Sequence, residues 1–142
     1  MRNIRLMVAT AGTALTVLAA SVSIGLAGSQ QSTAASKVRV TLKEFTLVPS
    51  AKSASAGKVT FAVANKGKMA HELIVIKTNK APGALPVKNG RASEAGKISA
   101  IRSIGPGKTK SLTVTLKKGK YVLICNVPGH YKAGQFAGFV VK

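Results

Sequence analysis

Three segments of this sequence carry a large apolar residue at every second position, and this period of two is the strongest constraint on the fold. The segments are 38–42 (VRVTL), 58–65 (KVTFAVAN) and 111–116 (SLTVTL). Successive side chains of a β-strand point to opposite faces, so each segment would place its apolar residues on one face. We therefore expect half-buried strands with Val38, Val40, Leu42, Val59, Phe61, Val63, Leu112, Val114 and Leu116 facing inward.

Two other segments, 72–77 (ELIVIK) and 121–125 (YVLIC), are continuously apolar, as expected of central strands. Residues 136–142 (FAGFVVK) predict a final strand. Turn sequences such as KKGK and GPGK separate the segments, and we interpret 105–109 (GPGKT) as a hairpin turn. Short strands at this spacing predict an all-β fold, an antiparallel sandwich or barrel.

Residues 78–97 (TNKAPGALPVKNGRASEAGK) depart from the strand pattern. This segment is rich in Gly, Pro and Lys and has little periodicity. A connection of this length within a small domain is usually functional or partly disordered. Within it, RASEAGK predicts a short helical turn.

The N-terminal residues 1–35 are expected to lie outside the folded domain, which we place at 36–142. Arg2 and Arg5 precede an uncharged stretch at 6–27, the pattern of an export signal, and Ala27 and Ala35 are plausible cleavage positions. The stretch is also long enough to act as an uncleaved membrane anchor. Either interpretation predicts an exported protein, in the periplasm or on the outer face of the cytoplasmic membrane.

The chain is strongly basic, with a formal net charge of +19, only three acidic residues and no Asp. Catalytic pairs of carboxylates are therefore improbable. Nucleic-acid binding is disfavoured because the basic residues are mostly Lys, are spread thinly, and are accompanied by few aromatic residues. A basic surface that attracts acidic partners is the simpler interpretation.

The chemistry of the chain is concentrated in Cys125, the single cysteine, and the two histidines, His71 and His130. One possibility is a nucleophilic pair of Cys125 and His130, although no acidic residue lies near His130 in sequence. Another is a buried, inert cysteine. A third is a metal site, because neighbouring antiparallel strands would bring the start of HELIVIK and the end of YVLIC to one rim. One thiolate and two imidazoles suit blue copper.

The segments NKGKMAHELIVI and CNVPGHYKAGQ resemble those of the cupredoxins, the family of type 1 copper proteins, and the similarity covers residues 37–142. It implies a Greek-key β-sandwich that holds one copper ion, which alternates between Cu(I) and Cu(II). It also implies His71, Cys125 and His130 as equatorial ligands. Many relatives carry Met five residues after the histidine, whereas this chain has Gln135, as in the stellacyanin type. Met69 is the alternative axial ligand.

The resemblance further implies a one-electron carrier, not an enzyme, that passes electrons through the solvent-facing edge of His130. Small and apolar residues beside it could form a docking patch: Val127, Pro128, Gly129, Ala133 and Gly134. We expect a monomer with acidic redox partners and, because an amide oxygen favours Cu(II), a lower reduction potential than in methionine-ligated relatives. Two alternatives stay open: a copper-delivery protein with the same ligands, and a basic binding module with a vestigial site.

Overall fold

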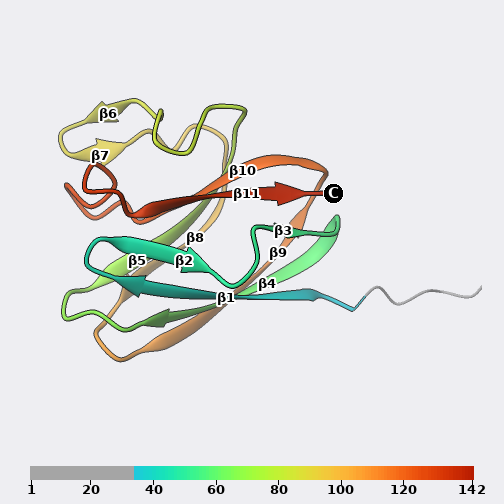
Figure 1. Ribbon diagram of the computed structural model, residues 1–142, viewed down its shortest axis with the longest axis horizontal. Coiled ribbons are helices and arrows are strands. Elements are labelled where there is room, and N and C mark those ends of the chain that lie inside the picture. Colours follow the sequence, from blue (N-terminus) through green and yellow to red (C-terminus); the bar gives the residue numbers. More distant parts are fainter. Residues whose placement is uncertain (1–33) are drawn as a thin grey trace, which may run out of the picture. The chain divides into compact units, whose positions relative to one another are not determined.

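The computed structural model describes residues 34–142, which form an all-β domain of two packed sheets (Figure 1). The predicted signal or anchor segment at 6–27 lies outside the described residues, so that interpretation stays a prediction. Over residues 34–142, the structure contains no helix long and apolar enough to cross a membrane.

The first sheet contains the three alternating segments. Its order is β2 (Thr46–Pro49), β1 (Ser36–Lys43), β4 (Gly57–Asn65) and β9 (Thr109–Leu116). Strands β1 and β4 run parallel, with Val38 opposite Phe61, whereas β2 and β9 pair antiparallel to their neighbours. The register places the inward residues of β1 and β4 on a single face.

The second sheet has the order β3 (Ser53–Ala54), β11 (Phe136–Val141), β10 (Gly119–Ile124), β5 (His71–Lys77) and β8 (Lys97–Ile104). It is antiparallel except for the short β3–β11 pair. The predicted β-sandwich is therefore confirmed, and the parallel β1–β4 and β3–β11 pairs are additions that the sequence pattern did not indicate.

The main hydrophobic core lies between the two sheets. The rings of Phe61 and Phe139 meet edge to face, with centroids 5.4 Å apart, and both side chains are fully buried. The predicted inward residues of β1 and β4 all belong to this core, while Leu112 and Val114 of the edge strand β9 are partly buried. Burial of each large apolar side chain stabilises the fold by about 1.5–3 kcal/mol.

A second apolar cluster covers the outer face of the five-stranded sheet. Ile74, Ile76, Val122 and Ile124 pack there against Leu85, Ala92 and Tyr131. Strands β5 and β10 are thus buried on both faces, which explains their continuous apolar sequences. Residues 78–97 act as an ordered cover, in which β6 (Val87–Lys88) and β7 (Arg91–Ala92) form a small hairpin (Figure 1).

Two local predictions are wrong. RASEAGK forms no helical turn: it begins with β7, and its last residue, Lys97, begins β8. Asn89 and Gly90, with φ of 51° and 75°, make the tight turn that closes the β6–β7 hairpin. Residues 105–109 do turn, with Lys108 N–H donating to Gly105 O, but they join β8 and β9 of different sheets and so form no hairpin.

Candidate metal centre

The pairing of β5 with β10 brings His71 and Cys125 to one edge of the sheet. The two strands are antiparallel, with Ile124 opposite Ile74, so the first residue of β5 lies near the residue that follows β10. This is the arrangement expected from the sequence.

A tightly hydrogen-bonded loop then returns the chain to the same place. The amide of Cys125 donates to Gln135 O at 3.0 Å, and the amide of Gln135 donates to His130 O at 3.1 Å. Gly129 and Gly134 have φ of 86° and 103°, which other residues rarely adopt. The loop therefore places His130 and Gln135 beside Cys125.

The structure brings all four predicted site residues together in the interior. His71 Nδ1 and His130 Nδ1 are 3.3 Å apart, and Cys125 Sγ lies 3.8 Å from the first and 3.5 Å from the second. His71, Cys125 and Gln135 are fully buried, and His130 is 3 % exposed. A point equidistant from the three ligand atoms lies about 2 Å from each, close to a metal–imidazole bond length. The donor set and its spacing fit one metal ion.

Gln135 and Met69 differ sharply in position. Gln135 Nε2 donates to Lys43 O at 3.0 Å and lies 3.1 Å from His71 Nδ1. Its buried Oε1 has no hydrogen-bond partner among the described residues. An orphaned buried acceptor is costly, and a metal ion in the cluster would satisfy it. Met69, by contrast, precedes β5 and is 46 % exposed, which argues against it as the axial donor.

Glu44 is a functional neighbour that sequence reasoning missed. It follows β1, and its Oε1 lies 3.1 Å from His71 Nε2. The same oxygen accepts the backbone N–H groups of Lys68 and Met69, each at 2.8 Å. The hydrogen bond from Met69 is the main reason that the pKa of Glu44 falls to about 2. Only the tertiary fold reveals this contact, because 27 residues separate Glu44 from His71.

The environment of Cys125 and His130 favours a bound cation. Burial raises the pKa of the Cys125 thiol, and the amide of Glu72 donates to its sulfur at 3.3 Å. Burial lowers the pKa of His130, with a further contribution from the neighbouring charge of His71. A neutral imidazole can offer its lone pair, and a metal ion compensates the thiolate charge that burial disfavours.

A polar network fixes the cover segment 78–97 to the ligand loop, residues 125–135, which carries Cys125, His130 and Gln135. Asn126, beside Cys125, accepts the Ala92 N–H at 2.7 Å and donates to Ala92 O and to Glu94 Oε1, each at 3.0 Å. Arg102 pairs with Glu94 at 2.8 Å and with Glu72 at 2.7 Å. Burial alone would raise the pKa of Glu94, but hydrogen bonds from Arg102, Asn126 and Lys97 outweigh it and lower the pKa to about 2. Glu44 and Glu72 thus lie beside predicted ligands, and Glu94 is linked to the ligand loop through Asn126.

The surface above His130 is apolar but more closed than expected. Pro128, Gly129 and Ala133 are exposed, as the predicted docking patch requires. His130 itself shows little edge to solvent. The ring of Phe45, which is 42 % exposed, meets its imidazole edge-on with centroids 5.2 Å apart. Phe45 therefore belongs to this patch.

The nucleophilic Cys–His alternative does not fit the burial of the site. Cys125 has no exposed surface through which a substrate could reach its sulfur.

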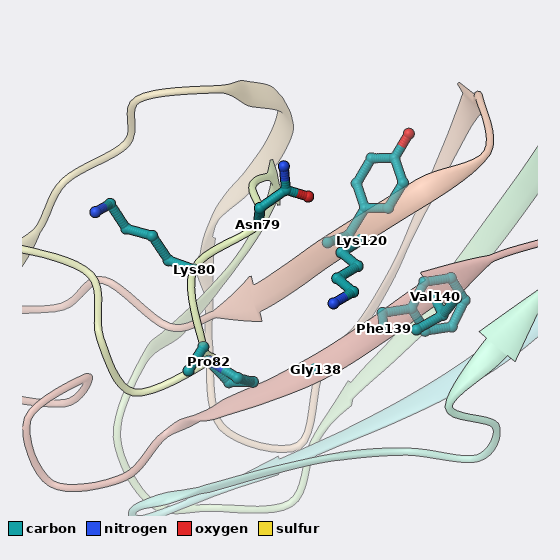
Figure 2. Close-up of a pocket in the computed structure, with 9 residues that line it drawn as sticks. Asn79, Lys80, Pro82, Lys120, Gly138, Phe139 and Val140 are labelled. Atoms are coloured by element: carbon teal, nitrogen blue, oxygen red, sulfur yellow. The ribbon is translucent and has the colours of Figure 1, made fainter.

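A pocket away from the metal centre lies between the segment that carries Asn79, Lys80 and Pro82 and the strands that carry Lys120 and Phe139 (Figure 2). None of the predicted site residues lines that pocket.

Together, the two-sheet sandwich and the buried cluster of one cysteine and two histidines define a small copper protein of the all-β class. A family model, that of the cupredoxin-like domain, matches residues 14–137. The chain belongs to the cupredoxin-like family, and its cofactor is a single copper ion.

Solved structures show the same fold at low sequence identity. Dithionite-reduced auracyanin from the photosynthetic bacterium Roseiflexus castenholzii is 22 % identical with a TM-score of 0.58, covering 77 % of this chain and 98 % of that protein. Reduced rusticyanin is 19 % identical, with a TM-score of 0.59 and coverage of 77 % and 81 %. Rusticyanin from Thiobacillus ferrooxidans is 16 % identical, with a TM-score of 0.59 and coverage of 77 % and 79 %. No curated protein sequence matches this chain.

Proposed function

We propose that this protein is a type 1 copper carrier of single electrons. His71, Cys125 and His130 serve as the equatorial ligands and Gln135 as the axial ligand. The observation that carries the proposal is the buried triangle of two imidazole nitrogens and one sulfur at one end of a cupredoxin sandwich. The copper ion supplies the one-electron change between Cu(II) and Cu(I).

The residues around the triangle support a centre that changes little between oxidation states. The ligand loop is closed by its own backbone hydrogen bonds, and Asn126 ties it to the cover segment. A fixed ligand set lowers the rearrangement that each electron transfer requires. Auracyanin and rusticyanin, which have a similar fold, have both been solved in the reduced state, and rusticyanin is described as a copper protein.

Gln135 is the stronger axial candidate because its amide is buried and its Oε1 lacks a partner in the described part of the chain. An amide oxygen is a harder donor than a thioether and favours Cu(II). Glu72, which follows His71 directly, has little influence on the potential, because Arg102 pairs with its carboxylate. We therefore expect the copper centre to have a lower reduction potential than methionine-ligated relatives.

Electrons would pass through the apolar patch of Phe45, Pro128, Gly129 and Ala133 above His130. The basic surface would steer acidic redox proteins to it in small, transient encounters, with this chain as a monomer. The basic start and uncharged stretch of residues 1–27 support export to the periplasm or to the outer face of the cytoplasmic membrane.

Burial favours carriage over delivery of copper, since all four proposed ligands are enclosed. The test is repeated electrochemical oxidation and reduction of the copper-loaded protein in the presence of a competing copper chelator. A carrier gives a reversible one-electron wave and keeps its copper through many cycles. Rapid loss of copper to the chelator in either oxidation state would contradict the proposal and favour delivery.

A further inference from the structure

The carboxylate of Glu44 is held in a fixed position on the outer side of His71. Its Oε1 accepts N–H groups from Lys68 and Met69, the residues that lead into β5, and lies 3.1 Å from His71 Nε2. These hydrogen bonds therefore link the end of β1 to the start of β5 beside His71, a proposed copper ligand.

This contact favours the proton on one of the two ring nitrogens of His71. An ionised carboxylate only accepts hydrogen bonds, so His71 Nε2 must be the donor. A neutral imidazole protonated at Nε2 has its lone pair on Nδ1. Nδ1 is the atom that faces Cys125 Sγ at 3.8 Å and His130 Nδ1 at 3.3 Å. Gln135 Nε2 lies 3.1 Å from the same atom, and this amide donor favours the same tautomer.

We propose that Glu44 is a positioning residue of the copper centre: it fixes the tautomer and orientation of His71 and places a negative charge behind this ligand. The effect of the Glu44 charge on the reduction potential rests on the proposed copper function. The effect of Glu44 on the tautomer of His71 applies to the copper-free chain as well. Carboxylate–histidine–metal arrangements orient the ring and raise the basicity of the ligand.

The other two glutamates do not share this role. Glu72 and Glu94 both pair with Arg102 at 2.7–2.8 Å, which compensates their charge. Among the described residues, the ion pairs of Glu44 include no Lys or Arg, only His71. The negative charge of Glu44 therefore acts mainly on His71, a proposed copper ligand.

Gly67 provides the room that the carboxylate needs. A Cβ at this position would collide with Glu44 Oε1 and with the rest of the carboxylate group. Gly67→Ala would therefore displace the carboxylate while leaving the net charge unchanged, which separates position from charge.

The first measurement is the protonation of the His71 ring nitrogens by ¹⁵N NMR of the copper-free protein, at a pH where both histidines are neutral. Wild type should carry the proton on Nε2 alone. In a Gln135→Met background, which removes the other contact that favours this tautomer, Glu44→Ala and Gly67→Ala should give a mixture of tautomers. An unchanged tautomer in Glu44→Ala in that background would overturn the inference, whether or not the protein binds copper.

The second measurement uses the copper-loaded protein. Glu44→Ala should weaken Cu(II) binding by about 10- to 100-fold, the usual effect of removing a partner of a metal ligand. Glu44→Gln keeps an acceptor oxygen but loses the charge, so the preference for Cu(II) should fall by about tenfold and the potential rise by about 59 mV.

Ser55→Lys is the matched control for net charge. It makes the same change of one unit at an exposed turn before β4, which begins at Gly57 and reaches the site only at its far end, Asn65. Its potential should stay at the wild-type value. Equal potentials in Glu44→Gln and wild type would overturn the inference while leaving the type 1 copper proposal intact. Absence of copper binding in wild type would refute that proposal and leave the tautomer measurement to decide the role of Glu44.

Discussion

Asn126 should contribute strongly to stability although it lies outside the ligand set. It is 1 % exposed, and its side chain serves both the N–H and the C=O of Ala92, which is 4 % exposed. Asn126→Ala removes these hydrogen bonds and leaves two buried backbone groups without partners. The third bond, to Glu94, is partly exposed and contributes less.

The magnitude follows from the two orphaned groups. Each buried polar group without a partner costs about 1–3 kcal/mol, so the variant should lose about 2–6 kcal/mol. That is a large fraction of the 5–15 kcal/mol, in order of magnitude, that stabilises a typical domain. The cover segment 78–97 would also loosen from the ligand loop.

The assay is urea unfolding of the copper-free protein, followed by circular dichroism, with Asn79→Ala as the matched control. Asn79 is exposed, at the rim of the pocket in Figure 2, and its replacement should change the free energy of unfolding by less than about 0.5 kcal/mol. A loss below about 1 kcal/mol in Asn126→Ala, or equal losses in the two variants, would refute the reasoning.

Three further outcomes are expected. Gln135→Met should raise the reduction potential, by about 59 mV for each tenfold loss of preference for Cu(II), and an unchanged potential in voltammetry would remove Gln135 as the axial ligand. Glu44 and Glu94 have folded pKa values of about 2, below their usual 4.5, so they stabilise the fold above pH 4.5 and lose this effect as the pH falls toward 2. Urea midpoints measured across this range should therefore decline, and Glu94→Gln should decline less steeply than wild type. Electron transfer to an acidic redox protein should slow as ionic strength rises, and a rate independent of salt in stopped-flow measurements would argue against basic steering.

The period-two pattern was sufficient to predict β1, β4 and β9 of the first sheet. Val38, Val40 and Leu42 face inward because alternate residues of a strand share a face. Strand β8 was not predicted because KISAIRSI buries only Ile101 and Ile104 fully and has irregular register with β5. Its position at the sheet edge explains the mixed sequence. The parallel pairing of β1 with β4 depends on long-range packing, which no local pattern encodes.

The site could be anticipated only in part. Cys125, His130 and Gln135 lie within one short loop, and His71 begins a recognisable strand, so residue types and spacing indicated them. Glu44 escaped notice because its contact with His71 crosses from β1 to β5. Phe45 was missed for the same reason, since it reaches His130 only in the folded chain.

The central claim is that Cys125 binds copper as a thiolate together with His71 and His130. Its most direct test is the visible absorption spectrum of the purified protein on titration with Cu(II). The account predicts an intense thiolate-to-copper band that saturates at one copper per chain and is absent in Cys125→Ser. A spectrum without such a band, or a band that persists in Cys125→Ser, would contradict it.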